Sequence, residues 1–338
     1  MDRFLGVDGG ATSTTCVVAT EEGMVLGVGY GGPSNHILAP GGRDRARAAL
    51  AEALDQATGQ LSPRPTEFRA AHLGMTGINR DTPQARALLD VARELLSAQT
   101  IGVSNDAEVA LAGALACRPG VVLIAGTGSV AFGRDGTGKD ARAGGWGYLF
   151  GDEGSAFALG RDGVRAALAA RDGTGPPTAL VDLLPKAAGM DLQDIPLAFY
   201  EGRLGRPHIA ALAPAVTLAA AEGDHVARKL VEEAAEALAR LATAVIGRLT
   251  WPEATMAVAT VGGVFRAGPV VLAPLRRALS AQAGGAILVP PRFAPALGAV
   301  LLAFQLAGVE FTPTRLALLA ATWEMRTAGR GPRDVVFR

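Results

Sequence analysis

Cysteine is scarce in this chain, and the 2 cysteines lie far apart in the sequence. Cys16 and Cys117 form no Cys-x-x-Cys pair and no cysteine–histidine spacing, so neither a zinc site nor a disulfide framework is expected. The 4 histidines are also unpaired, which argues against a histidine catalyst or a histidine metal cluster. Reduced thiols are typical of the cytoplasm, and a cytoplasmic location is expected.

Long apolar runs and a basic surface are missing as well. No uninterrupted apolar run reaches the roughly 18 residues of a membrane span. The start, MDRFLGVDGG, has no basic region followed by an apolar stretch, so we expect neither membrane insertion nor export. The formal net charge is +0, and the arginines are interleaved with acids. Without a basic stripe, a nucleic-acid partner is not expected.

What the chain does contain is length and a regular apolar pattern. With 338 residues and 49% hydrophobic content, it is long enough to form two domains. Short apolar runs alternate with amphipathic segments after an initial three-stranded meander, which predicts an α/β fold. The predicted strands are 4–7, 15–19, 24–28, 70–73, 100–103, 121–125, 130–133, 256–261 and 286–289. The predicted helices are 43–58, 82–96, 106–116, 155–170, 209–222, 225–249, 269–282 and 296–307.

The pattern of the N-terminus restarts in the middle of the chain. LGVDGGATSTTCVVATEEG and VLIAGTGSVAFGRDGTG share an apolar strand, a Gly/Thr turn, a second strand and an acidic-glycine turn. This self-similarity predicts a structural duplication. The expected domains are residues 1–116 and 117–312, with a C-terminal segment, 313–338, that packs back on the first domain.

Three glycine turns follow predicted strands: Asp8-Gly9-Gly10-Ala11-Thr12, Gly126-Thr127-Gly128-Ser129 and Gly262-Gly263-Val264. Each turn can direct several backbone N–H groups at a phosphate, although each is equally consistent with an ordinary hairpin or loop turn. The chain has no GxxxxGK[ST] and no GxGxxG that opens a helix after a strand, which argues against P-loop and Rossmann proteins. Two duplicated strand-turn-strand units predict a nucleotide cleft between two related domains.

Acidic residues stand where predicted strands or loops lead into helices. Asp106, after a strand, fits a general base for phosphoryl transfer, but either Asn105 or Asp106 also fits a helix cap. Asp152 and Glu153 in GGWGYLFGDEGSA carry the same two interpretations, ligand contact or helix-start stabilisation. Asp8 is either a turn residue or a carboxylate that holds a water of Mg²⁺ beside a bound nucleotide.

Six motifs occur in the order seen in one known family. Together they resemble the N-acetylglucosamine kinase branch of the BadF/BadG-type ATPases, within the superfamily of sugar kinases, actin and heat-shock chaperone ATPases. The motifs are DGGATST (8–14), PSNH (33–36), SNDA (104–107), IAGTGS (124–129), GGWGYLFGDEGSA (144–156) and VGGV (261–264). The resemblance implies two duplicated actin-like, ribonuclease H-like domains with a nucleotide cleft between them. The glycine turns are shared across the superfamily, whereas the pairing of SNH with GGWG…GDEGSA is narrower.

The resemblance also implies a reaction, its cofactors and the residues that serve them. ATP and Mg²⁺ are the implied cofactors, with Asp106 as the base toward the sugar 6-hydroxyl and Asp8 holding Mg²⁺ through water. The expected sugar contacts are Asn35, His36, Ser129, Gly145, Trp146, Gly147 and Asp152. The expected ATP contacts are Gly9, Gly10, Thr12, Gly126, Thr127, Gly128, Gly262 and Gly263. The implied protein is a homodimeric kinase that converts an amino sugar, foremost N-acetylglucosamine, to its 6-phosphate.

The same residues also allow other sugar substrates and two functions other than a sugar kinase. Val130 stands where the animal kinases carry asparagine after GTGS, so glucosamine and N-acetylmuramate remain alternative substrates. Other relatives activate acyl-CoA reductases or dehydratases through an iron-sulfur cluster, but Cys16 falls in a predicted strand and Cys117 at a helix end. A non-catalytic sugar sensor is a third interpretation, and the intact Asp106 argues against it.

Overall fold

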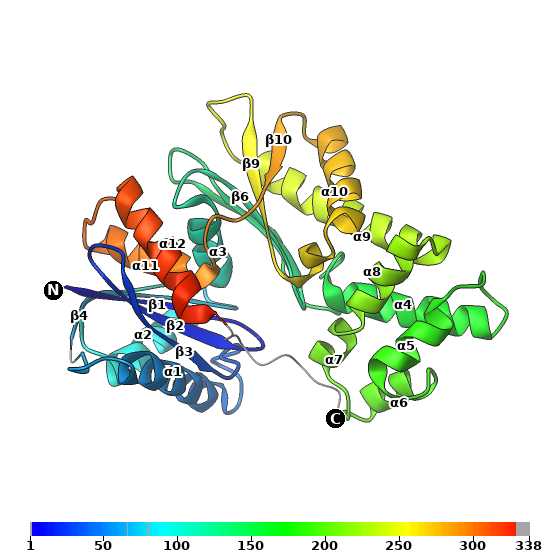
Figure 1. Ribbon diagram of the computed structural model, residues 1–338, viewed down its shortest axis with the longest axis horizontal. Coiled ribbons are helices and arrows are strands. Elements are labelled where there is room, and N and C mark those ends of the chain that lie inside the picture. Colours follow the sequence, from blue (N-terminus) through cyan, green and yellow to red (C-terminus); the bar gives the residue numbers. More distant parts are fainter. Residues whose placement is uncertain (1, 66, 80, 329–338) are drawn as a thin grey trace. The chain divides into compact units, whose positions relative to one another are not determined.

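The computed structural model describes residues 2–65, 67–79 and 81–328, and the chain divides into two compact units. Unit 1 combines the N-terminal part through Arg118 with the segment that begins at Pro291. Unit 2 is the central part, Pro119–Pro290. Figure 1 shows a twisted sheet with flanking helices in each unit. The predicted α/β class is therefore confirmed.

Unit 1 is built on a 5-stranded sheet in the order β3-β2-β1-β4-β5. Its strands are β1 (Arg3–Gly9), β2 (Thr14–Thr20), β3 (Val25–Gly31), β4 (Phe68–Met75) and β5 (Ala98–Asn105). The first three form the predicted antiparallel meander, whereas β4 and β5 run parallel to β1. The carboxyl ends of β1, β4 and β5 therefore meet at one edge of the sheet.

Helices cover both faces of this sheet because side chains along β1 alternate between them. Leu5 and Val7 pack with α1 (Gly42–Gly59) and α2 (Pro83–Leu95) in one buried cluster. Phe4 packs on the opposite face with α11 (Pro295–Leu306) and α12 (Pro313–Thr327), where its ring meets Phe304 edge to face at 4.7 Å. Figure 1 shows these two helix layers on either side of the blue strands. Helix α3 (Asp106–Leu115) packs against α11.

Unit 2 repeats this plan. Its 5-stranded sheet has the order β10-β9-β6-β7-β8, with β6, β7 and β8 antiparallel and β9 and β10 parallel to β6. The strands are β6 (Gly120–Ala125), β7 (Ser129–Arg134), β8 (Asp140–Gly144), β9 (Met256–Val261) and β10 (Ala286–Val289). Since β6 to β10 match β1 to β5 in both order and direction, the predicted duplication is confirmed.

The helices of unit 2 form one continuous apolar core with part of its sheet. They are α4 (Ala156–Arg171), α5 (Leu180–Ala188), α6 (Asp194–Tyr200), α7 (Arg206–Ala210), α8 (Ala213–Glu222), α9 (His225–Ile246) and α10 (Pro269–Gln282), with the short 3₁₀ turn η1 (Gly263–Ala267). The longest of these, α9, packs along β6, β7 and β8. Among the described residues, no helix is long and apolar enough to cross a membrane.

Several predicted elements differ from the structure. The single helix predicted at 209–222 is wrong, because α7 ends at Ala210 and α8 starts at Ala213. Pro214 in the first turn of α8 lacks an amide hydrogen and cannot continue a preceding helix. The sequence pattern also missed β8, α5, α6 and α12. The first three are short, and Pro185 interrupts the periodicity of α5.

The boundary between the two parts also differs from the sequence interpretation. Residues 291–312, assigned by pattern to the second domain, lie in unit 1. The backbone N–H groups of Arg292 and Phe293 donate to the carbonyls of Ala114 and Gly113, which ties this segment to the end of α3. Farther along, Thr322 of α12 accepts a hydrogen bond from the Val25 N–H of β3 at 2.9 Å. The final residues of the C-terminal segment, 329–338, lie outside the described residues.

Candidate functional site

Three polar side chains gather at the carboxyl edge of the unit 1 sheet. Asp8 lies near the end of β1, Thr76 follows β4, and Asp106 follows β5. The parallel register pairs Asp8 with Gly74, and Gly74 with Ser104, so the strand ends are level. Asp8 and Asp106 are therefore two strand spacings apart, roughly 10 Å across the sheet. This edge is where open α/β sheets usually bind ligands.

Asp106 is oriented by its neighbours while another residue caps the helix. Asn105 is the cap of α3, because its side chain accepts the N–H of Ala107 and donates to the carbonyl of Ile78 at 2.9 Å. The Asp106 Oδ2 accepts a 2.5 Å hydrogen bond from the Thr76 hydroxyl, and Oδ1 accepts the Ala107 N–H at 2.9 Å. Of the two predicted capping candidates, Asn105 takes the role, and a carboxylate held at both oxygens stands at the edge of the sheet.

The environment of Asp8 favours its neutral form. Although part of Asp8 remains accessible to solvent, burial of its carboxyl and then the nearby charge of Asp106 raise its pKa to about 7. A carboxylate whose charge is destabilised in this way is a donor that fits a hard cation such as Mg²⁺. The described residues contain no cluster of three or more histidine, cysteine, aspartate or glutamate side chains that could hold a metal ion.

The predicted sugar-contact segment lies beside the first glycine turn of unit 1. The Ser34 N–H donates to the carbonyl of Gly10 at 3.2 Å, and the Ser34 hydroxyl accepts from the Thr14 hydroxyl at 2.9 Å. Asn35 follows directly, with its carbonyl bound by Arg45 at 3.0 Å. His36 is exposed and has a left-handed backbone, with φ 57°. The structure thus brings Asn35 close to the Gly10 turn and leaves His36 at the surface.

The glycine turns differ in the space beside their backbones. A side chain at Gly9 would meet the Ser34 Oγ at 2.6 Å, so this glycine serves packing. At Gly10 the nearest atom would be the Ser13 carbonyl oxygen at 3.4 Å, which leaves the backbone open. Thr12, in the same turn, is exposed. The first turn therefore offers an open backbone segment only from Gly10 onward.

In unit 2 the two remaining glycine turns lie together. Ile124 and Val261 are register partners, so the turns after β6 and β9 are adjacent, and Gly262 packs directly against the carbonyl of Ala125. Around Gly126 and Gly263, no atom would lie within 4 Å of an added side chain. These two glycines form an open backbone surface beside the partly buried Thr127, while the space beside Gly128 is filled by a carboxylate.

That carboxylate belongs to Asp152, which is only 4% exposed. The Asp152 Oδ1 accepts the Ser129 N–H at 3.2 Å, and Oδ2 accepts from Arg206 Nη2 at 2.9 Å. Helix α4 is capped by Ser155, whose hydroxyl accepts the Ala158 N–H at 3.1 Å. Capping therefore does not explain the Asp152 side chain, which faces the turn after β6.

The segment between β8 and α4 presents bare backbone and an uncovered tryptophan. Gly145 and Gly147 adopt left-handed conformations, with φ 72° and 85°, and Arg142 Nη2 holds the Gly145 carbonyl at 3.1 Å. Within unit 2, Trp146 is 78% exposed. Ser129 is buried below this segment, with its hydroxyl donating to the Glu153 carbonyl at 2.7 Å. The predicted sugar contacts of unit 2 thus form one continuous patch.

Two residues of these arrangements were missed by the sequence analysis. Thr76 lies in a Gly-Met-Thr-Gly turn after a predicted strand, a position that signals a ligand-facing edge even without a known motif. Arg206 belongs to no motif and is 54 residues from Asp152 in the chain, so only the fold reveals their pairing.

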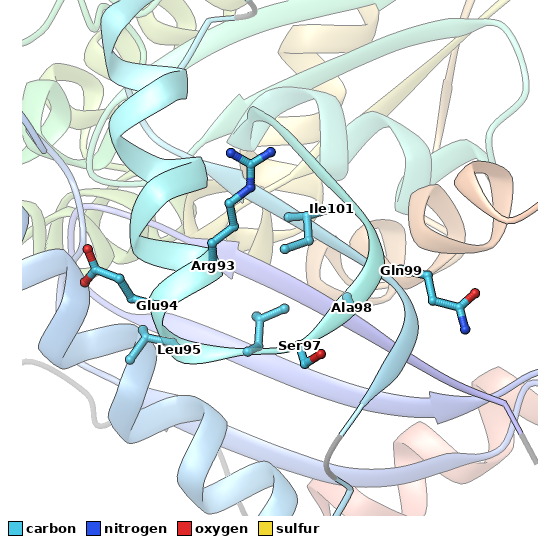
Figure 2. Close-up of a pocket in the computed structure, with 8 residues that line it drawn as sticks. Arg93, Glu94, Leu95, Ser97, Ala98, Gln99 and Ile101 are labelled. Carbon is cyan, nitrogen blue, oxygen red and sulfur yellow. The ribbon is translucent and has the colours of Figure 1, made fainter.

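A groove of about 570 Å³ lies elsewhere on unit 1, where α2 leads into β5. Figure 2 shows its labelled lining residues around this turn. The groove is lined by the end of α2 and by the first half of β5, as far as Ile101, whereas Asp106 follows the last residue of β5. The second half of the strand, roughly 16 Å long, separates Ile101 from Asp106. The groove is therefore not part of the sheet edge at which Asp8, Thr76 and Asp106 lie.

Comparison with known proteins gives consistent matches over nearly the whole chain. Residues 5–303 match the BadF/BadG/BcrA/BcrD ATPase family. An N-acetylmuramic acid/N-acetylglucosamine kinase of Clostridium acetobutylicum is 31% identical over 90% of this chain and 98% of its own. An N-acetyl-D-glucosamine kinase of Dictyostelium discoideum is 30% identical over 89% and 98%. The crystal structure of a candidate N-acetylglucosamine kinase from Chromobacterium violaceum has a TM-score of 0.72 and 27% identity over 89% and 99%.

Proposed function

The chain belongs to the BadF/BadG/BcrA/BcrD ATPase family, and we propose on that premise that it is an ATP-dependent kinase of an amino sugar. N-acetylglucosamine is the foremost substrate and its 6-hydroxyl the acceptor. The observation that carries the proposal is Asp106, whose carboxylate is fixed at the carboxyl edge of the sheet by Thr76 and Ala107. A binding protein without chemistry has no need of such a base.

Asp106 acts as the general base in this proposal. Its carboxylate accepts the proton of the sugar hydroxyl while that oxygen forms a bond to the γ-phosphorus and the bond to ADP breaks. The Thr76 hydroxyl and the Ala107 N–H each occupy one acceptor position, one on each oxygen. Thr76 is thus an orienting residue for the base.

The open glycine turns are the proposed contacts for ATP. Gly10 and Thr12 in unit 1, and Gly126 with Gly263 in unit 2, present uncovered backbone or an exposed hydroxyl to phosphate oxygens. Gly9, Gly128 and Gly262 support these turns by close packing, and Thr127 adds a hydroxyl. Mg²⁺, when bound, neutralises charge on the phosphates. Asp8 is proposed to hold a water of that ion, and its raised pKa is consistent with a carboxylate that a cation would stabilise.

For the sugar, we propose hydrogen bonds from hydroxyls to polar groups and contact of the ring with an apolar wall. Asn35 and His36 serve from unit 1, and Ser129, the Gly145–Gly147 backbone and Asp152 serve from unit 2. The uncovered indole of Trp146 is the apolar wall for a ring face or an acetyl methyl. Val130 lies against Gly145, so this position offers no polar contact and leaves glucosamine and N-acetylmuramate as alternative substrates.

An activator that carries an iron-sulfur cluster is the weaker alternative. Cys16 is 1% exposed inside β2, and burial raises the pKa of its thiol to about 12, so its thiolate is inaccessible to a cluster. Cys117 ends the turn after α3, where its N–H donates to the Ala112 carbonyl. Neither position resembles a loop that binds an iron-sulfur cluster. A cytoplasmic location and a homodimer complete the kinase proposal, and sedimentation analysis tests the dimer.

The test is an ADP-release assay with ATP and Mg²⁺ against a panel of sugars. Glucosamine, N-acetylglucosamine, N-acetylmannosamine, N-acetylmuramate and glucose are compared at equal concentration. The expected result is strong stimulation by N-acetylglucosamine or another amino sugar, and little by glucose. Absence of stimulation by every sugar of the panel would remove the proposal.

A further inference from the structure

We propose that Arg206 is a positioning residue for the sugar: its guanidinium holds the Asp152 carboxylate in the orientation that receives sugar hydroxyls. This inference rests on the proposed function, in which Asp152 contacts the sugar. The ion pair joins Arg206 Nη2 to Asp152 Oδ2 at 2.9 Å, with the two side chains 29% and 5% exposed. Arg206 belongs to no known motif. It follows two short helices, α5 and α6, that the sequence pattern did not predict.

Asp152 needs a partner of opposite charge in this place. Burying a carboxylate is costly unless it is paired and hydrogen-bonded. Apart from Arg206, the hydrogen bond described for its side chain comes from the neutral Ser129 N–H at 3.2 Å. Because so little of Asp152 is exposed, the orientation of its carboxylate depends on these two contacts within the protein.

The guanidinium of Arg206 is held in place by two aromatic rings. Its carbon lies 4.9 Å from the centre of the Tyr148 ring and 5.8 Å from that of Phe157. These two rings meet each other edge to face at 5.2 Å. Among the described residues, the buried Arg206 Nε has no hydrogen-bond partner. The arginine therefore takes its orientation from the rings and from Asp152, rather than from its own full set of hydrogen bonds.

The backbone that carries Arg206 is fixed as well. Arg206 is the first residue of α7, and the His208 ring accepts the Gly205 N–H at 3.0 Å across the start of this helix. Gly160 on α4 lets α7 approach closely, because a side chain at Gly160 would collide with the Ile209 carbonyl. Helices α4 and α7 thus form one rigid support, and the arginine reaches Asp152 from a defined position.

A consequence follows for the reaction. Two acceptor positions of Asp152 are taken by Ser129 and Arg206, and roughly two remain for sugar hydroxyls. With Arg206 in place these positions are fixed before the sugar binds, which lowers the cost of ordering on binding. In the described contacts of unit 2, Arg206 contacts Asp152, Tyr148 and Phe157 and neither of the open glycines Gly126 and Gly263. Its effect is therefore expected on the sugar KM, and little on ATP.

The experiment measures kcat and both KM values for Arg206→Met and Arg206→Lys. Methionine keeps the apolar contact with Tyr148 and Phe157 but removes the donor. We expect a sugar KM raised on the order of tenfold, from the lost charged hydrogen bond, and an ATP KM within about twofold of the original. Lysine keeps the charge and should restore part of the sugar KM. Arg203→Met is the matched control, because Arg203 pairs with the exposed Glu201 and should leave all three constants unchanged.

A double-mutant cycle with Asp152→Asn tests whether Arg206 acts through Asp152. If it does, the Asp152→Asn enzyme and the double variant should have nearly the same sugar kcat/KM. Fully multiplicative effects, or an unchanged sugar KM in Arg206→Met, would overturn the inference. An equal rise in both KM values together with a lowered melting temperature would also overturn it, since that pattern is expected for a residue with a purely structural role.

A sugar-independent readout separates this inference from the proposed function. The Ser129 amide donates to the same carboxylate, so its nitrogen-15 NMR resonance reports the orientation of Asp152. We expect this resonance to move in Arg206→Met and to stay in place in Arg203→Met. If the unmodified protein phosphorylates no sugar, the proposed function fails. In that case the Ser129 amide resonance still tests whether Arg206 orients Asp152. A resonance that does not move in Arg206→Met would contradict the positioning role of Arg206.

Discussion

The contact between α3 and α11 gives a prediction that links packing to the proposed catalytic base. A methyl group added at Gly298 of α11 would collide with the Val109 carbonyl oxygen and the Gly113 nitrogen of α3. It would also lie 2.9 Å from the Gly113 Cα, whereas carbon atoms pack at about 3.5–4.0 Å. The obstructing atoms are backbone, so no side chain can rotate away. In Gly298→Ala, the two helices must separate by roughly 1 Å.

The expected change in the free energy of unfolding of Gly298→Ala has two opposing contributions. Overpacking of this kind costs about 1–3 kcal/mol, and rigid backbone neighbours place this site at the upper end. Replacing glycine by alanine inside a helix stabilises the helix by about 1 kcal/mol. The expected net loss is about 2 kcal/mol, which corresponds to a melting temperature about 4–8 °C lower for a unit of about 150–250 residues, the size range of unit 1. Because Asp106 is the first residue of α3, the shift also moves the base, and a displacement of about 1 Å can lower turnover by up to about 100-fold.

The assay combines thermal unfolding with steady-state kinetics, and the chain offers a matched control. Gly59, at the end of α1 in the same unit, has an ordinary backbone conformation and no atom within 4 Å of an added side chain. Gly59→Ala should therefore keep or slightly raise the melting temperature and leave kcat unchanged. A Gly298→Ala protein with the melting temperature and kcat of the original would refute the reasoning about this contact.

Two further predictions concern the carboxylates of unit 1. Asp106→Asn should lower kcat by about 10²–10⁴-fold, since it removes a general base, while both KM values change little; near-normal turnover in the kinetic assay would refute the base assignment. The pKa of Asp8 is raised to about 7, above its unfolded value of 3.8, so Asp8 contributes stability that is fully present below about pH 4 and lost as the pH rises through about 7. Thermal unfolding without Mg²⁺ should show this loss in the original protein and a smaller one in Asp8→Asn; identical pH profiles would contradict the shift.

The sequence predicted the unit 1 edge well because its signals are local. Asp106 follows an apolar strand directly, and Asp8 stands near the end of another. The parallel arrangement of β1, β4 and β5 then brings these positions to one edge. Neighbouring residues in the chain and a single topological rule are sufficient for this part of the site.

The sequence could not reveal arrangements that depend on long-range packing. The pairing of Asp152 with Arg206 requires α7 to lie against α4, and this depends on Gly160, a residue with no local pattern. Likewise, the apolar run of α11 fits either domain by composition. Its place in unit 1 follows from the close approach of Gly298 to α3, which only the folded chain shows.

The central claim is transfer of a phosphoryl group from ATP to an amino sugar, and the product tests it most directly. The protein is incubated with ATP, Mg²⁺ and N-acetylglucosamine, and the sugar product is analysed by phosphorus–proton correlation NMR. The account predicts a phosphorus signal coupled to the two protons at carbon 6 and its loss when Asp106→Asn replaces the original protein. ATP consumption that yields only inorganic phosphate, with no phosphorylated sugar, would contradict it.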